Sequence, residues 1–298
     1  MVYLSVSYAG IYHDLRKFAK RAIRERQYEK VMMFILLFFM IRLFMFLNRM
    51  IMGDRISISW SSVSGVEWYA LAVGVYYLFT MFLKKFAQKQ MLCLALVAGC
   101  VAGYDRKIGD TYALARIITF YPFFLIGYYL KSETLLEIAK KKWVKVLAAV
   151  VILAAIGISI CYIDKIYWTI DLLKGNCSYR IFEKSDRMYA VFWRLGQYLV
   201  TALLVAAVFV ITPSRKFRFS YIGRNTLSIY ALHYMVIDLF YHAFRGTERL
   251  MKISETYYVF LLIPIGIFLV WLLSLKPFVR LVNWLIRPRV LPEYQSEK

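Results

Sequence analysis

The sequence predicts an all-α integral membrane protein, a polytopic helical bundle with about eight transmembrane helices. Of the 298 residues 61% are hydrophobic, with a mean hydropathy of +0.56, whereas roughly 45–50% is typical of a soluble domain. The apolar residues gather in runs whose lengths approach the roughly 20 residues that a helix needs to cross a bilayer. Basic residues cluster between these runs, as they do in the loops of membrane proteins.

Eight apolar runs are candidate spans, and the run at 91–104 is short for a crossing. The fourth run contains "RIITFYPFFLIGYYLK", with Pro122 in mid-span. Proline there frees a backbone carbonyl and kinks the helix, and Tyr121 is placed to repair the kink. A purely structural kink is the alternative to a functional one. The expected spans are 31–48, 66–83, 91–104, 115–130, 144–163, 190–212, 226–243 and 256–275.

After the last span, "KPFVRLVNWLIRPRV" has apolar residues at helical spacing, with Arg280 and Arg287 beside Trp284. We expect the tail, 276–298, to be amphipathic and to lie along the cytoplasmic membrane surface. The sequence shows no internal repeat, and its longest loop is too short to be a domain. We therefore expect 1–298 to form a single membrane domain.

The charge pattern predicts the orientation. The chain has 39 Lys and Arg against 18 Asp and Glu, a formal net charge of +21. With both termini cytoplasmic, 24 Lys and Arg fall on the cytoplasmic side and 12 on the outer side. Cytoplasmic loops of membrane proteins show the same excess of Lys and Arg. The membrane topology therefore accounts for the positive charge, and nucleic acid is not expected as a partner. The sequence predicts a multi-pass protein of the cell (inner or plasma) membrane, with the bilayer as its partner.

The four cysteines predict neither a disulfide framework nor a metal site. They form no CxxC pair, and three of them lie in apolar runs, where cysteine usually serves as a small core residue. We expect no bound metal ion.

Ionisable residues within spans are functional candidates, because burying a charge in hydrocarbon is costly. The expected topology places several of them at outer depth, which suits a polar cavity that opens outward. Snorkelling and structural ion pairs are the alternative, with Arg116 paired to Glu67 or Arg194 to Asp238. The residues at outer depth are Arg42, Glu67, Arg116, Arg194 and Asp238.

His233 lies deeper than these residues. It is about eight residues into its span, roughly 12 Å at the rise of an α-helix, and so near the midplane. Asp238 follows five residues later and does not share its face. His233 is either a hydrogen-bonded structural residue or a general base, since the histidine pKa is near neutral.

Three segments carry a resemblance to a known family. "RIITFYPFFLIGYYLK", "YIGRNTLSIYALH" and "EWYALAV" resemble the membrane acyltransferase-3 superfamily, in particular its fucose 4-O-acetylase-like branch, over roughly 60–290. The resemblance implies a membrane enzyme of ten helices. Such an enzyme moves an acyl group, often acetyl, from acetyl-CoA or another acyl-CoA to a hydroxyl of a surface glycan or a lipid-linked precursor in the cell envelope. No bound cofactor is implied.

The family's usual catalytic histidine lies in the first helix, eleven residues after an arginine. That spacing is absent here, since Val2, Ile222 and Ala231 stand eleven residues before the three histidines. The resemblance therefore implies a chain that starts late, without the family's first one to two helices. Alternatives are a non-catalytic remnant or partner subunit of such an enzyme, or a polysaccharide transporter or polymerase.

The resemblance also implies roles for particular residues. Arg116 would contact the oxyanion or substrate, and His233 would orient or deprotonate the acceptor hydroxyl. A basic group near the N-terminus would meet the phosphates of coenzyme A, unless it only marks the cytoplasmic side. The implied substrate-binding residues are Glu67, Trp68, Tyr69, Tyr121, Arg194, Asn225 and Asp238, and the donor-binding residues are Arg16, Lys20, Arg21 and Arg24.

Overall fold

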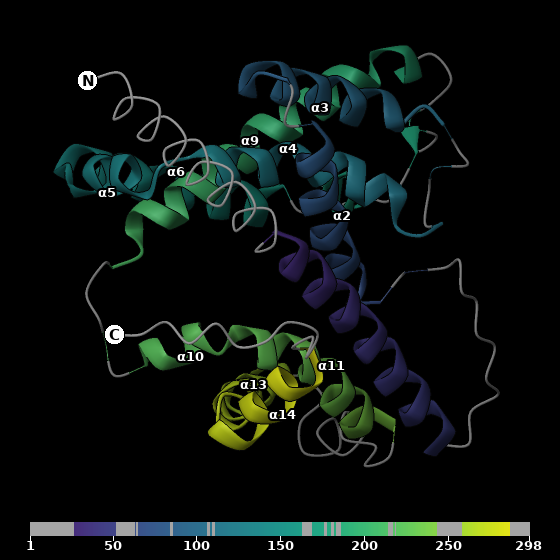
Figure 1. The fold of residues 1–298 in the computed structure, drawn as a ribbon. Helices are drawn as coiled ribbons and strands as arrows, with labels where there is room; N and C mark the ends of the chain where they lie inside the picture. Colours follow the sequence, from purple (N-terminus) through teal and green to yellow (C-terminus); the bar gives the residue numbers. More distant parts are fainter. Residues whose placement is uncertain are drawn as a thin grey trace, which may run out of the picture. The chain divides into compact units, whose positions relative to one another are not determined.

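The structure is a computed structural model, and its regular elements are helices (Figure 1). Contacts divide the chain into two compact units. The first unit comprises the described residues of 1–58, 65–82 and 217–298, and the second those of 59–64 and 83–216. The structure describes residues 27–51, 63, 65–83, 86–105, 108, 111–162, 169–175, 178–179, 182, 186–213, 217, 219–242 and 258–286.

Among the described residues, the first unit contains six helices from both ends of the chain: Gln27–Ile51 (the N-terminal helix below), α2 (Trp68–Phe82), α10 (Ser220–Arg224), α11 (Thr226–His242), α13 (Tyr258–Leu273) and α14 (Lys276–Ile286). The N-terminal helix packs against α2, whose Gly74 admits the side chain of Ile35; a Cβ at Gly74 would lie 3.4 Å from it. Beside this contact the rings of Phe34 and Tyr77 stack at 6.2 Å.

A bend of 62° separates α13 from α14. A helix end leaves its last carbonyls without intrahelical donors. Here Asn225 Nδ2 donates to the carbonyl oxygen of Ser274 at 2.9 Å, and Ser228 Oγ donates to that of Leu273 at 2.9 Å. Two polar side chains at the start of α11 therefore hold the bend.

The second unit contains two closely packed helix pairs, α3 with α4 and α6 with α9. Gly99 of α3 lies directly against Tyr198 of α9, because a Cβ there would be 1.9 Å from the Tyr198 oxygen. The elements are α3 (Gln88–Ala102), α4 (Leu114–Tyr129), α5 (Ser132–Lys140), α6 (Lys142–Cys161), α8 (Thr169–Lys174), η3 (Asp186–Tyr189) and α9 (Ala190–Ile211).

Pro122 lies inside α4, as the sequence predicts, and it cannot donate to the carbonyl of Ile118 one turn earlier. The hydroxyl of Tyr198 reaches this part of α4 and donates to the carbonyl oxygen of Thr119 at 3.0 Å. A tyrosine of another helix thus binds the backbone beside the proline, and the repair of the kink by Tyr121 stays a prediction.

The described residues hold three helices that are long and apolar enough to cross a membrane: Gln27–Ile51, Lys142–Cys161 and Asp186–Ile211. The bent pair Leu262–Leu273 and Lys276–Ile286 makes a fourth if it is one span. A helix occupies each of the eight expected stretches, so the all-helical membrane fold is confirmed. The other helices are shorter, and the number of eight crossings stays a prediction.

Candidate functional site

The predicted site residues are divided between the two units. The first unit carries Glu67, Trp68, Tyr69, Asn225, His233 and Asp238, and the second carries Arg116, Tyr121 and Arg194. Arg16, Lys20, Arg21 and Arg24 lie outside the described residues.

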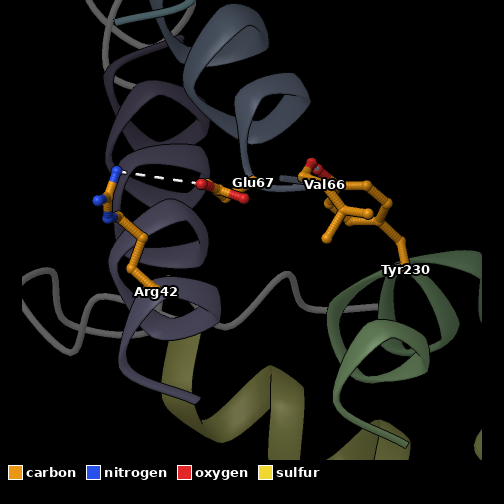
Figure 2. Close-up of polar contacts among 4 residues, drawn as sticks. All are labelled: Arg42, Val66, Glu67 and Tyr230. Carbon is orange, nitrogen blue, oxygen red and sulfur yellow. Dashed lines mark hydrogen bonds and ion pairs between the residues drawn. The ribbon is translucent and has the colours of Figure 1, made fainter. Parts of the chain in front are cut away.

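Glu67, just before α2, is a buried carboxylate. Its side chain is 5% exposed, and its Oε1 lies 4.0 Å from Nη1 of Arg42 on the N-terminal helix (Figure 2). Its other oxygen, Oε2, is buried without a hydrogen-bond partner among the described residues. Gly65 leaves room for this oxygen, since a Cβ there would be 2.2 Å away. A buried carboxylate needs an opposite charge, and Arg42 supplies it.

Tyr230 ties α11 to the segment that carries Glu67. Its hydroxyl donates to the carbonyl oxygen of Val66, the residue before Glu67 (Figure 2). The ring of Tyr69 meets that of Tyr230 edge to face, with centroids 5.6 Å apart. Tyr69 is 49% exposed, so its ring is open to a ligand. The neighbouring Trp68 ring lies 6.0 Å from that of Tyr69.

His233 follows Tyr230 by one turn of α11 and is half-buried, with the two rings 6.1 Å apart. Its Nδ1 lies 2.8 Å from the carbonyl oxygen of Tyr230 and 3.1 Å from that of Ile229. A carbonyl oxygen only accepts hydrogen bonds, so these partners assign the proton of the neutral ring to Nδ1. The Nε2 atom is then left with a lone pair that can accept a hydrogen bond or a proton.

Asp238 connects α11 to the N-terminal helix. Its Oδ2 accepts a hydrogen bond of 2.7 Å from Nδ2 of Asn48, which is 1% exposed. The same amide lies 3.5 Å from the carbonyl oxygen of Met235. Polar side chains therefore bind the N-terminal helix to α11 and to the start of α2, Asn48 through Asp238 and Arg42 through Glu67.

Asn225 uses its amide to hold the bend between α13 and α14, as described above. Through this hydrogen bond, Asn225 stabilises the fold of the first unit. Its predicted contact with substrate stays a prediction, and the contact would compete with the bond to Ser274.

Arg194 is enclosed in the second unit, with 1% of its surface exposed. Its Nη1 donates to the carbonyl oxygen of Leu172 at 3.0 Å and to Oε1 of Gln197 at 2.6 Å. The guanidinium also lies 5.5 Å from the centroid of the Tyr179 ring. These contacts fasten α8 and the residues after it onto α9, so Arg194 stabilises the fold in this unit.

Tyr179 completes this cluster. Its hydroxyl donates to the carbonyl oxygen of Cys100 at 2.7 Å, and its backbone N–H donates to that of Gly103 at 2.7 Å. Burial raises the pKa of the Tyr179 phenol, while the hydrogen bond and charge of Arg194 oppose the rise. The phenol therefore stays a neutral hydrogen-bond donor at physiological pH.

Arg116 and Tyr121 both lie on α4. Arg116 is the third residue of the helix and is half-buried, and Tyr121 is buried with its ring stacked on that of Phe124 at 6.3 Å. The pairs Arg116 with Glu67 and Arg194 with Asp238 stay predictions, as does a site shared by Arg116 and His233.

A comparison with known protein families shows to which family the chain belongs. The model of the acyltransferase-3 family, an acyltransferase domain, matches residues 6–275. The chain belongs to this family. No curated protein and no solved structure matches the chain. The match includes residues of both units and confirms the resemblance to the acyltransferase-3 family; membership of the fucose 4-O-acetylase-like branch stays a prediction.

The polar contacts of the first unit in this acyltransferase-3 protein also involve three residues for which the sequence predicted no specific role in the site. Arg42 is the partner of Glu67, and Asn48 is the partner of Asp238. Tyr230 stands three residues before His233, within the same motif. Asn48 could have been singled out in the sequence because it is a polar residue inside an apolar run. Among the described residues, no three His, Cys, Asp or Glu side chains lie close enough to hold a metal ion.

Proposed function

We propose that this acyltransferase-3 protein is a membrane O-acyltransferase. It transfers an acetyl-like group from acetyl-CoA or another acyl-CoA to a hydroxyl of a surface glycan or its lipid-linked precursor. In this proposal it belongs to the fucose 4-O-acetylase-like branch and works in the cell (inner or plasma) membrane, crossing it about eight times with both termini cytoplasmic. The family match and the apolar helices support the membrane acyltransferase part of this proposal.

The observation that carries the proposal is the orientation of His233. Its Nδ1 proton points at two backbone carbonyls of its own helix, so Nε2 is the nitrogen that can receive the acceptor hydroxyl. A hydrogen bond at Nδ1 sets the tautomer of a histidine, and a neutral ring with its lone pair on Nε2 suits a group that orients a hydroxyl or accepts its proton. The half-exposed ring of Tyr69, packed on the Tyr230 ring, offers an aromatic surface to the apolar side of a sugar.

The reaction has simple requirements. The acceptor hydroxyl donates its proton as its oxygen attacks the carbonyl carbon of the thioester, and an ester bond forms as the carbon–sulfur bond breaks. The proton ends on the sulfur, which leaves as the thiol of coenzyme A. His233 Nε2 orients the hydroxyl or accepts its proton on the way. Arg116 is proposed to stabilise the oxyanion, and basic residues such as Arg16 and Arg24 to meet the phosphates of the donor.

The test is a comparison of surface glycans between a strain that lacks the gene and its parent. We expect one O-acyl ester to disappear in the deletion strain and to return when the gene is restored. The purified protein in lipid nanodiscs, supplied with radiolabelled acetyl-CoA and the unmodified glycan, should then transfer the label. Identical glycans in both strains would contradict the proposal.

A further inference from the structure

After the bend between α13 and α14, two cations and an exposed aromatic ring lie on one face of α14. On α14, Lys276, Arg280 and Trp284 recur every four residues and therefore follow one face of the helix. All three are exposed, with Trp284 at 60%. The buried residues of the same helix, Val282 and Ile286, are also four apart and lie on its other side, and α14 packs on α11.

The segment before α11 also carries exposed aromatic rings and a cation. Phe217 and Phe219 expose large parts of their rings, 56% and 69%, and Arg224 is exposed at the end of α10. Arg224 directly precedes Asn225, whose amide binds the carbonyl oxygen of Ser274 at the bend. The start of α11 and the start of α14 therefore adjoin (Figure 1). We call this set the bend surface: Phe217, Phe219, Arg224, Lys276, Arg280 and Trp284.

This composition suits neither bulk water nor the hydrocarbon of a bilayer. Exposed Phe and Trp rings are costly in water, and Lys and Arg are costly in hydrocarbon. Both kinds of residue are favourable at the boundary between headgroups and acyl chains, where aromatic rings and cations concentrate. The bend surface therefore fits the membrane interface.

The charge of the bend surface favours one kind of lipid. Within the described residues of 217–242 and 258–286, Asp238 is the single acid, and it stands thirteen residues beyond Asn225 on α11, roughly 20 Å along the helix. The three cations of the bend surface are thus without a neighbouring carboxylate from these segments. An anionic headgroup complements them, whereas a zwitterionic one does not.

We propose that the bend surface is a binding site for the headgroups of anionic lipids. The hydrogen bonds from Asn225 and Ser228 fix the bend, so the backbone at the start of α14 is held beside Asn225, the residue after Arg224, before lipid binds. Such a site loses less conformational freedom on binding than a mobile tail would. This inference does not depend on the acyltransferase reaction.

The test uses the full chain in nanodiscs and follows hydrogen–deuterium exchange of the peptides from α14. One set of nanodiscs contains phosphatidylcholine alone, and in the other phosphatidylglycerol replaces part of it. We expect slower exchange in α14 with phosphatidylglycerol. The double variant Lys276→Gln/Arg280→Gln should lose this protection, because each cation near an anionic surface contributes about five-fold in affinity.

Two controls make the result specific. The variant Lys131→Gln/Lys140→Gln removes the same charge from the two ends of α5, a helix that carries Glu133 and Glu137, and it should keep the protection of α14. The swap Lys276→Arg/Arg280→Lys preserves the charge and should behave as the wild type. Equal exchange in the two lipids would overturn the proposal, and so would protection by inorganic phosphate added to phosphatidylcholine nanodiscs.

Discussion

The guanidinium Nη1 of Arg42 lies 4.0 Å from the carboxylate Oε1 of Glu67, and this pair joins the N-terminal helix to the start of α2. Glu67 is almost fully buried, while the Arg42 side chain keeps 16% of its surface exposed. Removing one partner of such a pair costs more than the pair itself contributes, because the remaining charge has lost its compensation.

Glu67→Gln should therefore destabilise the protein. Glutamine retains an oxygen for Arg42 but lacks the charge, and we expect a loss of about 1–3 kcal/mol in the free energy of unfolding in detergent. The double variant Arg42→Met/Glu67→Gln should cost less than the sum of the two single variants. Glu29→Gln, an exposed acid on the same N-terminal helix, is the matched control. Equal stability of Glu67→Gln and Glu29→Gln would show that the pair contributes nothing.

Gly99→Ala should weaken the packing of α3 on α9. The new Cβ would lie 1.9 Å from the oxygen of Tyr198, a buried ring that cannot move without breaking its bond to Thr119. We expect a loss of about 1–3 kcal/mol, measured by thermal unfolding in detergent. Gly157→Ala on α6 meets no atom within 4 Å and should be tolerated. Adding Tyr198→Phe should recover part of the loss; no recovery would locate the clash elsewhere.

The helices of this protein could be predicted from the sequence because a crossing helix must be apolar over most of its length. Each of the eight expected stretches coincides with a helix, including the short third one at Gln88–Ala102. The same reasoning predicts the depths of Glu67 and His233 in the membrane, and these depths stay predictions. The contact that fixes the His233 tautomer is local, since it lies within one turn of α11, and so it could be derived from helical geometry.

The partners of the polar residues could not be predicted in this way. Hydropathy gives the depth of a residue in a membrane but not the neighbour of each helix. Arg42 is 25 residues from Glu67 in the sequence, and Asn225 is 49 residues from Ser274. These pairs depend on which helices pack together and on how each is rotated about its axis. Motif similarity predicts a substrate contact for Asn225, which stays a prediction, but it gives no hint of the bond between its amide and the carbonyl of Ser274.

The orientation of the chain can be tested with single cysteines. Because 24 Lys and Arg are expected on the cytoplasmic side and 12 on the other, cysteines at Lys84 and Lys140 should resist a membrane-impermeant maleimide in intact cells. A cysteine at Asp171 should react. Cys177 should be replaced by serine beforehand, because it falls in the same expected outer loop. Labelling at Lys84 combined with protection at Asp171 would invert the topology.

Arg116→Ala should impair acyl transfer more than Arg49→Ala does. Arg116 is half-buried in α4, where a charge that contacts an oxyanion is worth roughly 10²–10³ in rate. Arg49 is exposed in the last turn of the N-terminal helix. The measurement is restoration of the glycan ester in a deletion strain, at matched protein levels. Equal restoration by both variants would remove Arg116 from the reaction.

His233→Gln separates orientation of the acceptor hydroxyl from its deprotonation. Glutamine can still hydrogen-bond a hydroxyl but cannot take its proton. If His233 orients the hydroxyl, the substitution should reduce the transfer rate by about tenfold at most, because glutamine retains part of the hydrogen bonding and a complete hydrogen bond is worth about that much.

A larger loss of rate would show that His233 accepts the proton of the acceptor hydroxyl. A positioned base contributes roughly 10²–10⁴-fold, so a fall of that size would make Nε2 the general base and would contradict the orienting role. Tyr234→Phe, the next residue on α11, keeps its ring and should retain activity, which excludes a general disturbance of the helix. The rates should be measured with saturating acetyl-CoA in nanodiscs, because a change confined to the KM for the glycan would indicate lost binding while an effect on kcat would indicate lost chemistry.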